Sequence, residues 1–382
     1  YNKKIMLNKI KQLIVSFIDY FRLARHDLHS EFKFFYDPPP KKVAEIQDYE
    51  SKLKIVSEIL KFNTKCNYFY ENLSICQELK IEGLWKGVLL DYKKKQLDTY
   101  LSKNTDQIML MHEGMFYNYL INGLIGYSNF KDIKFNPTAK LLFLKDLGLY
   151  KIIFRNFDSL PSNNYIKKWG YKNKNNKINF CDASSMLQKN LILNSLKLLN
   201  KREKYNIMEI GGGFGSLAER LFEEDKISSL ILLDIPSTLI TAFYYLSSKF
   251  GLDKVKILNS PSDVEKYYNL NDTKKILLIP TCYYDLIKNI KDINLLCNFH
   301  SFSEMNFDTI KFYLQNMPEE VKIIVSANSN IAVKTKDHLE VISDKFPIPK
   351  KFDLVFSNID IPYFVNWRYK TCVWLNKSLP ES

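Results

Sequence analysis

The stretch that decides the fold is residues 207–217, which read Ile-Met-Glu-Ile-Gly-Gly-Gly-Phe-Gly-Ser-Leu. An apolar strand is predicted to end in Glu209-Ile210, a loop carrying Gly211, Gly213 and Gly215 follows, and a helix is expected from about Ser216. Glycine lets the backbone turn sharply and approach a ligand where a side chain would clash. Amide groups at the start of a helix can donate hydrogen bonds to that ligand. The pattern therefore predicts a strand–loop–helix unit that binds a ligand through its backbone.

A second acidic residue follows the next apolar run. Leu230–Leu233 is predicted to be a strand, and Asp234 ends it 19 residues beyond Gly215. An acid at that interval lies at the carboxyl edge of the neighbouring strand, where it can accept hydrogen bonds from both hydroxyls of a ribose. The glycine loop and this acid together predict a ligand that contains adenosine.

Two adenosine cofactors use such a site. Dinucleotide-binding folds have the pattern G-x-G-x-x-G, or a small residue at the sixth position, whereas here Gly215 comes one place early and Ser216 is sixth. The pattern is instead E-x-G-x-G-x-G, with the carboxylate of Glu209 at the strand end. A carboxylate suits the amino and sulfonium groups of S-adenosylmethionine and would repel a pyrophosphate. We therefore predict S-adenosylmethionine as the cofactor and keep an NAD-dependent oxidoreductase as an alternative.

The second half of the chain alternates short apolar runs with helical segments. The runs predicted to be parallel strands are Tyr205–Ile210, Leu230–Leu233, Ile276–Ile279, Ile293–Cys297 and Val321–Ser326. Near-continuous apolar runs of this kind are typical of a parallel sheet covered on both faces. Leu354–Phe356 and Thr371–Leu375 are predicted to close the sheet as an antiparallel pair, and Val255–Leu258 is left open as a further strand. The predicted fold class is α/β, a doubly wound, Rossmann-like sheet over residues 181–382.

Residues 1–180 have a mainly helical pattern. Apolar residues recur at three- and four-residue spacing in Ile46–Phe62, Leu89–Leu101 and Ile108–Leu124. The Lys- and Asn-rich stretch Tyr165–Asn179 is predicted to be an exposed loop between two domains. Ile5–Leu23 is predicted to be an amphipathic helix, which allows at most a peripheral contact with a membrane. We expect this helical half to recognise the acceptor or to form a homodimer.

Composition narrows the function classes. A chain of 382 residues with 46% hydrophobic and 25% charged residues is neither disordered nor fibrous. The net charge of +13 invites an interaction with nucleic acid or an anionic membrane. No zinc knuckle, RNP-type motif or continuous basic helix supports nucleic-acid binding, so a methyltransferase fold that binds nucleic acid or a membrane is kept only as an alternative. The six cysteines form no C-x-x-C pair, which favours a reducing compartment.

The second half resembles a known family, the sugar O-methyltransferases, a branch of the class I S-adenosylmethionine-dependent methyltransferases. The segments that carry the resemblance are Met208–Leu217, Leu233–Leu246, Pro280–Leu286 and Cys297–Met305. The most specific of them contains Asp234-Ile235-Pro236-Ser237-Thr238 followed by Tyr244-Tyr245-Leu246. The resemblance covers residues 181 to 376 and implies a cytoplasmic enzyme of polysaccharide biosynthesis. Such an enzyme would methylate a hydroxyl of a saccharide or sugar-nucleotide acceptor, with no nucleic acid as partner.

The resemblance also assigns cofactor contacts residue by residue. Glu209 and the three loop glycines match the loop that binds the methionine part, and Asp234 matches the ribose acid. Ile235 is expected against the adenine ring, and Cys282-Tyr283 follows the third strand, where such enzymes bind adenine. That turn lacks the Asp or Asn that would bind the adenine amino group. Asn298 ends the fourth strand, where the methyl group meets the acceptor.

Methyl transfer to a hydroxyl needs an aligned acceptor and a group that takes its proton. His300, two residues beyond Asn298, is the first candidate for that base, and Glu304 is the second. Each residue could instead have a purely structural role. His300 could form a hydrogen bond within the turn, and Glu304 could be a carboxylate favoured in the first turn of a helix. His112 is a weaker candidate that would line the acceptor cleft. No metal site is predicted, although three acids near this segment could contribute to one: Asp285, Glu304 and Asp308.

Overall fold

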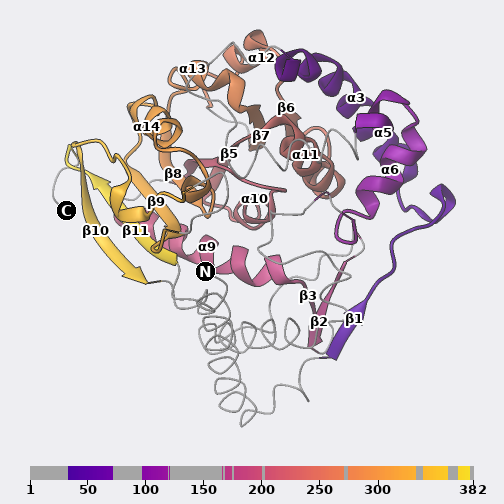
Figure 1. The fold of residues 1–382 in the computed structure, drawn as a ribbon, viewed down its shortest axis with the longest axis horizontal. Coiled ribbons are helices and arrows are strands. Elements are labelled where there is room, and N and C mark those ends of the chain that lie inside the picture. The colour runs from indigo at the N-terminus through magenta and orange to yellow at the C-terminus, as the bar shows by residue number, and fades with distance from the viewer. Residues whose placement is uncertain are drawn as a thin grey trace.

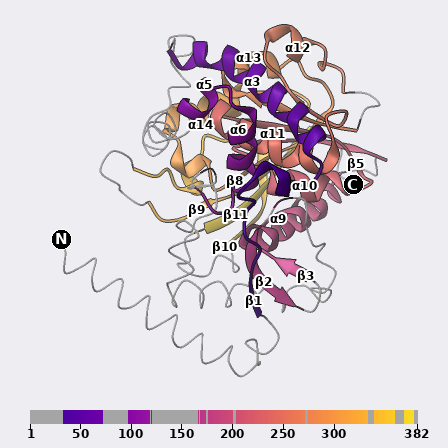
Figure 2. The ribbon, with the colours of Figure 1, turned by 90° about the vertical axis from the view of Figure 1, so that its right-hand side faces the viewer.

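The computed structural model describes residues 33–71, 97–118, 120, 166, 168–173, 176–199, 203–270, 274–332, 339–359 and 369–378. The predicted helix at Ile5–Leu23 lies outside these ranges, as do parts of the predicted helices Leu89–Leu101 and Ile108–Leu124. The described chain is built around an eight-stranded sheet in the order β10-β11-β9-β8-β4-β5-β7-β6. A separate three-stranded antiparallel sheet, β1-β2-β3, lies to one side of it (Figures 1 and 2).

Six strands of the large sheet run parallel to one another. Their bounds are β4 (Tyr205–Ile210), β5 (Ile227–Asp234), β6 (Val255–Ile257), β7 (Lys275–Pro280), β8 (Ile293–Phe299) and β9 (Ile323–Ser329). Two antiparallel strands, β10 (Phe352–Ile359) and β11 (Tyr369–Asn376), complete it, with β11 between β9 and β10. The predicted doubly wound, Rossmann-like sheet is therefore confirmed, and Val255–Leu258 does contribute a strand.

The sheet has a separate hydrophobic core on each face, because alternate residues of a strand point to opposite sides. On one face, Ile207 and Leu232 pack with α9 (Phe180–Leu196), α10 (Ser216–Phe222) and α11 (Pro236–Phe250). On the other face, Met208 and Leu233 pack with a second set of helices. These are α12 (Pro261–Glu265), α13 (Tyr284–Ile287) and α14 (Phe307–Gln315). Burial on both faces explains why the strands are apolar throughout.

The described part of the first half packs directly on this sheet domain. It contains α3 (Tyr49–Glu71), α5 (Leu97–Leu101) and α6 (Thr105–Glu113), which are the purple helices beside α11 in Figure 1. Buried residues of α3 and α6 belong to the same core as those of α9, α10 and α11. The division of the chain at residue 180 stays a prediction.

The small sheet corrects one expectation. Its strands are β1 (Lys33–Tyr36), β2 (Trp169–Asn173) and β3 (Asn176–Ile178), so two of them lie where an exposed loop was predicted. The prediction of an exposed loop was wrong, since Trp169 and Ile178 are only 3% and 1% exposed. The abundance of Lys and Asn around them hid this pairing.

Two further properties concern only the part of the chain that the structure describes. None of its helices combines the length and the apolar composition needed to cross a membrane. It includes Cys181, Cys282, Cys297 and Cys372, none of which forms a disulfide bond.

Candidate functional site

The sequence-predicted residues come together at the carboxyl edge of the parallel strands. β4 ends at Ile210 and leads into the glycine loop, and its neighbours β5 and β8 end at Asp234 and Phe299. β7 leads into a 3₁₀ helix, Thr281–Tyr283. In an open parallel sheet, this edge is where ligands bind.

Two of the loop glycines are required by space as well as by backbone conformation. Gly211, Gly213 and Gly215 have φ angles of 74°, 58° and 89°, which side chains rarely tolerate. A Cβ atom on Gly211 would lie 2.0 Å from Ser301 Oγ, and one on Gly215 would lie 2.7 Å from Leu246 Cδ1. The loop is therefore pressed against its neighbours and leaves no room for a side chain at these two positions.

Glu209 is buried at the strand end that precedes the loop. The residue is 5% exposed, and its Oε2 atom has no hydrogen-bond partner among the described residues. Burial, and then the charge of Asp234, raise the pKa of this carboxyl group to about 8. A buried carboxylate without a partner is costly, so this oxygen is suited to receive a cationic or hydrogen-bond-donating ligand.

Asp234 lies on the neighbouring strand and orders the loop. Its Oδ2 accepts a hydrogen bond from the Gly213 N–H at 2.9 Å, and its Oδ1 accepts one from the Ile235 N–H at 2.7 Å. Burial nevertheless raises its pKa to about 7. Within the described ranges, no Lys or Arg forms an ion pair with Asp234 or Glu209. Two carboxyl groups beside a glycine loop fit the cationic, ribose-bearing cofactor predicted from the sequence.

The residues predicted to contact adenine lie at the same edge. Ile235 is half-buried and forms the N-terminal cap position of α11, and Cys282 is half-buried at the end of β7. The side chain of Tyr283 is buried, and its hydroxyl donates a hydrogen bond to the Asn259 carbonyl oxygen at 3.1 Å. The structure thus places Ile235 and Cys282 where a ligand can reach them and uses the Tyr283 hydroxyl to join two strand ends.

Asn298 is completely buried and makes hydrogen bonds in several directions. Its Nδ2 donates to the Ile210 carbonyl oxygen at 2.8 Å and to Ser301 Oγ at 2.5 Å. Its Oδ1 accepts from the Phe302 N–H at 3.0 Å and from Asn328 Nδ2 at 2.8 Å. The Asn298 side chain therefore holds the start of the glycine loop in place. Sequence reasoning missed Ser301 and Asn328, which meet Asn298 only in the folded chain.

His300 has a left-handed backbone, with φ at 69°. Its ring stacks on the Tyr369 ring with centroids 4.5 Å apart and 21° between the planes. Its backbone N–H donates to the Ala327 carbonyl oxygen at 2.9 Å. Glu304 is half-buried at the end of a 3₁₀ helix, Phe302–Glu304. The catalytic roles of His300 and Glu304 stay predictions, and nothing in the sequence pointed to Tyr369.

His112 does not line a cleft, which corrects the expectation for it. The residue is 0% exposed, its Nε2 lies 2.9 Å from the Tyr100 hydroxyl, and its ring stacks on Tyr244. Burial lowers its pKa to about 3, so the imidazole is neutral at physiological pH. Helical spacing had correctly marked a buried face, but that face packs against α11. For metals, the described part of the chain contains no group of three or more His, Cys, Asp or Glu side chains placed to bind an ion.

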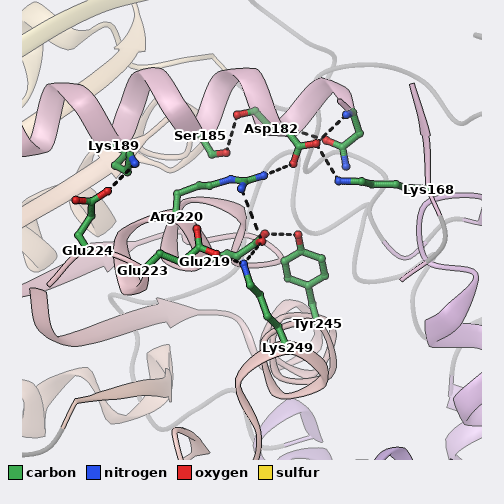
Figure 3. Close-up of polar contacts among 11 residues, drawn as sticks. Lys168, Asp182, Ser185, Lys189, Glu219, Arg220, Glu223, Glu224, Tyr245 and Lys249 are labelled. Atoms are coloured by element: carbon green, nitrogen blue, oxygen red, sulfur yellow. Dashed lines mark hydrogen bonds and ion pairs between the residues drawn. The ribbon is translucent and has the colours of Figure 1, made fainter. Parts of the chain in front are cut away.

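Behind the glycine loop, a buried ionic network holds α10 in place (Figure 3). Asp182, in the first turn of α9, lies 2.7 Å from the Arg220 guanidinium and 2.9 Å from Lys168 Nζ. Glu219, next to Arg220 on α10, pairs with Lys249 Nζ at 2.7 Å. Burial alone would raise the pKa of Asp182, but the two cations and a backbone hydrogen bond hold it below its ordinary value. Each carboxylate of this network thus has a cation of the protein beside it.

Comparison with known proteins gives partial matches. No protein-family model matches the chain. The ribosomal RNA small subunit methyltransferase A of Blochmanniella floridana is 28% identical over 201 residues, which are 48% of this chain and 67% of the relative. The protein of the same name from Blochmanniella pennsylvanica is 24% identical over 181 residues, 44% of this chain and 63% of the relative. The matched regions thus span about two thirds of each relative.

Similarities to solved structures are confined to about half of the chain. TrmK of M. capricolum, in complex with S-adenosyl-homocysteine, is 16% identical with a TM-score of 0.30, covering 49% of this chain and 68% of that one. The mitomycin 7-O-methyltransferase MmcR is 11% identical with a TM-score of 0.32, covering 52% of this chain and 56% of that one. The fold assignment rests on the strand order of the chain itself.

The comparisons correct the predicted partners. We predicted a saccharide or sugar-nucleotide acceptor and no nucleic acid as partner. The curated relatives contradict this prediction, because they are named as methyltransferases of ribosomal RNA. The resemblance to sugar O-methyltransferases and the assignment to polysaccharide biosynthesis find no support in these names. The physical reason for the error is that the motifs in the sequence concern the cofactor and carry no information about the acceptor.

Proposed function

We propose that the chain is an S-adenosylmethionine-dependent methyltransferase whose acceptor is RNA. The observation that carries the cofactor proposal is the buried Glu209 Oε2, which has no hydrogen-bond partner among the described residues and lies beside a second carboxyl group, Asp234. Such a pair is stabilised by a bound cation. The names of the two curated relatives support the RNA acceptor.

The chain's own residues would divide the cofactor between them. S-adenosylmethionine supplies a methyl group on a sulfonium, which is a good leaving group. Glu209 and the backbone of the glycine loop would hold the cationic methionine end, because the loop has no side chains at the closest points. Asp234 would accept hydrogen bonds from the ribose hydroxyls. Ile235 and Cys282, both half-buried at this edge, would contact the adenine.

Two features favour a nucleic-acid acceptor. The stacked rings of His300 and Tyr369 lie at the carboxyl end of β8 and offer planar groups of the kind on which unpaired bases stack. The net charge of +13 attracts a polyanion over roughly a Debye length. His300, or Glu304 close behind it, would take the proton released by the acceptor as the methyl group arrives.

Calorimetry with S-adenosylhomocysteine tests the cofactor proposal. The wild type should bind it, and Asp234→Ala should bind about tenfold or more weakly, because the ribose loses its acceptor and the loop loses the hydrogen bond that Gly213 donates. Asp253→Ala is the matched control, since Asp253 is an exposed acid outside the site. If the wild-type protein binds neither S-adenosylhomocysteine nor S-adenosylmethionine, the proposal fails.

Methyl transfer from labelled S-adenosylmethionine tests the acceptor. Small-subunit ribosomal RNA should take up label, and His300→Ala should reduce turnover while leaving S-adenosylhomocysteine affinity within about twofold. The transfer should weaken steeply with added salt, as expected for phosphate contacts. Label that enters a saccharide fraction and not RNA would overturn the RNA assignment and leave the cofactor assignment standing.

A further inference from the structure

Three consecutive residues of α11 contact three different parts of the molecule. The Tyr244 hydroxyl donates to Glu113 Oε1 of α6 at 2.7 Å. The Tyr245 hydroxyl donates to Glu219 Oε2 of α10 at 2.5 Å. Leu246 lies against Gly215, so closely that a Cβ there would be 2.7 Å from it. This helix therefore lies between the first half of the chain, the glycine loop and the helix that follows the loop.

The contacts of Tyr245 lead straight to the glycine loop. Its ring packs edge-to-face on Phe214, with centroids 5.1 Å apart, and Phe214 is the residue between Gly213 and Gly215. Phe116, which belongs to the first half, packs on Phe214 at 5.6 Å and on Tyr245 at 6.2 Å. Phe116, Phe214 and Tyr245 are 5%, 3% and 2% exposed, so all three rings are buried. We call these three residues the aromatic link.

The first-half end of the aromatic link is itself held firmly. The Phe116 carbonyl oxygen accepts a hydrogen bond from Trp169 Nε1 at 2.8 Å. Just before it, Glu113 forms an ion pair with Lys52 Nζ of α3 at 2.6 Å, and both side chains are 5% exposed. The position of Phe116 is thus determined by α3 and β2, far from the carboxyl edge in sequence.

We propose that the aromatic link lets the first half of the chain set the conformation of the glycine loop, which makes Phe116 and Tyr245 positioning residues for the cofactor. The proposal rests on the proposed function, because the loop is where the cofactor would bind. Three glycines with positive φ give this loop little intrinsic preference for one shape. Phe214 is the only side chain between Gly213 and Gly215, and edge-to-face packing on two rings fixes where it lies.

Coupling of this kind works in both directions. An acceptor that orders the first half would raise the affinity of the loop for its cofactor. The bound cofactor would in turn raise the affinity for that acceptor by the same factor. The link thus gives the helical half a role in cofactor binding that acts through the packing of Phe116 on the loop. Phe116 acts only through Phe214 and Tyr245.

Phe116→Leu tests the proposal, with Phe222→Leu as its matched control. Phe222 is also 5% exposed and packs edge-to-face on a ring, Phe250 at 4.9 Å, but it lies at the far end of α10 from the loop. Phe116→Leu should weaken S-adenosylhomocysteine binding by about three- to tenfold. Phe222→Leu should lower the melting temperature comparably and change the affinity by less than about twofold. Equal affinity changes in the two variants, or an unchanged affinity in Phe116→Leu, would overturn the proposal.

A second measurement is independent of any ligand. Hydrogen exchange at the amides of Gly211–Gly215 in the ligand-free protein should speed up in Phe116→Leu and stay at the wild-type rate in Phe222→Leu. If Phe116→Leu does not fold, Phe214→Leu breaks the same contact from the loop side and should show the same acceleration. If loop exchange is faster in the link variants but the wild-type protein binds no S-adenosylhomocysteine, the link stands and only the cofactor proposal is refuted. Unchanged exchange in both link variants would refute the link itself.

Discussion

Two groups of buried carboxylates in this molecule behave differently. Behind α10, Asp182 is paired with Arg220 and Lys168, and these cations hold its pKa below the ordinary value although burial opposes this. In front of α10, Glu209 and Asp234 have no cation among the described residues, and burial raises their pKa values to about 8 and about 7. All three carboxyl groups are at least nine-tenths buried.

The difference teaches how to separate a structural charge from a binding one. Burial is the same in both groups, so burial does not distinguish them. What differs is whether the protein supplies the opposite charge. Where it does, the carboxylates fix helices to one another, and where it does not, they hold a place for a ligand that brings the charge.

The largest effect should come from removing a cation of the satisfied group. Arg220→Leu leaves Asp182 and Glu219 buried without their guanidinium, and it should lower the free energy of unfolding by about 3–5 kcal/mol. Lys189→Leu is the control, because the Lys189–Glu224 pair is partly exposed (15% and 33%) and should be worth about 0–1 kcal/mol. Urea denaturation measures both. Equal losses in the two variants would mean that the network behind α10 is not a structural charge group.

The next effect concerns the group that lacks a cation. Glu209 must be ionised to hold a cationic cofactor, and its pKa is about 8 in the ligand-free protein. The ratio of the dissociation constants of Glu209→Gln and wild type for S-adenosylmethionine should therefore rise roughly 50-fold between about pH 6 and pH 8. The ratio isolates this carboxyl group, since the amino group of the ligand titrates equally in both experiments. A ratio that does not change with pH would show that Glu209 meets no cation.

The smallest effect is on stability without ligand. A pKa raised by folding means that the folded state binds more protons, so wild-type stability falls as the pH rises from the ordinary carboxyl pKa of 4.5 to about 8 and then levels off. Glu209→Gln lacks this group, so its stability relative to wild type should rise by about 1.4 kcal/mol between pH 7 and pH 9. Glu319→Gln, at an exposed position, serves as the control and should follow the wild type at both pH values. A Glu209→Gln variant that is less stable than wild type near pH 9 would mean that the carboxylate has a partner in the protein.

The parallel strands could be predicted because burial on both faces makes each of them a short apolar run. The strand-end residues Glu209 and Asp234 could be predicted with them, since their chemistry is tied to a fixed interval along the chain. The strands β2 and β3 contribute few residues to the core, namely Trp169 and Ile178, and their neighbours in the sequence are polar. Such short strands give no periodic pattern to detect.

Other parts of the site depend on contacts that only folding creates. The side-chain amide of Asn298 donates to the Ile210 carbonyl oxygen 88 residues away, which its place at a strand end does not reveal, and its contact with the ligand stays a prediction. Tyr369 meets His300 because β11 lies next to β9 in the sheet. Helical spacing placed His112 on a buried face but could not say that Tyr244 of α11 covers it. Position along an element can be predicted from sequence, whereas the identity of the neighbour cannot.

The packing of α3 against α11 also has a consequence for how the protein is made. α11 begins at Pro236, 165 positions after α3 ends at Glu71. At bacterial or eukaryotic rates of roughly 5–20 residues per second, the ribosome needs roughly 10–30 s to pass from one to the other. During that time α3, whose buried residues include Ile59 and Phe62, lacks the partner that α11 provides. The core that α3 shares with the sheet domain therefore cannot be completed until α11 has left the ribosome.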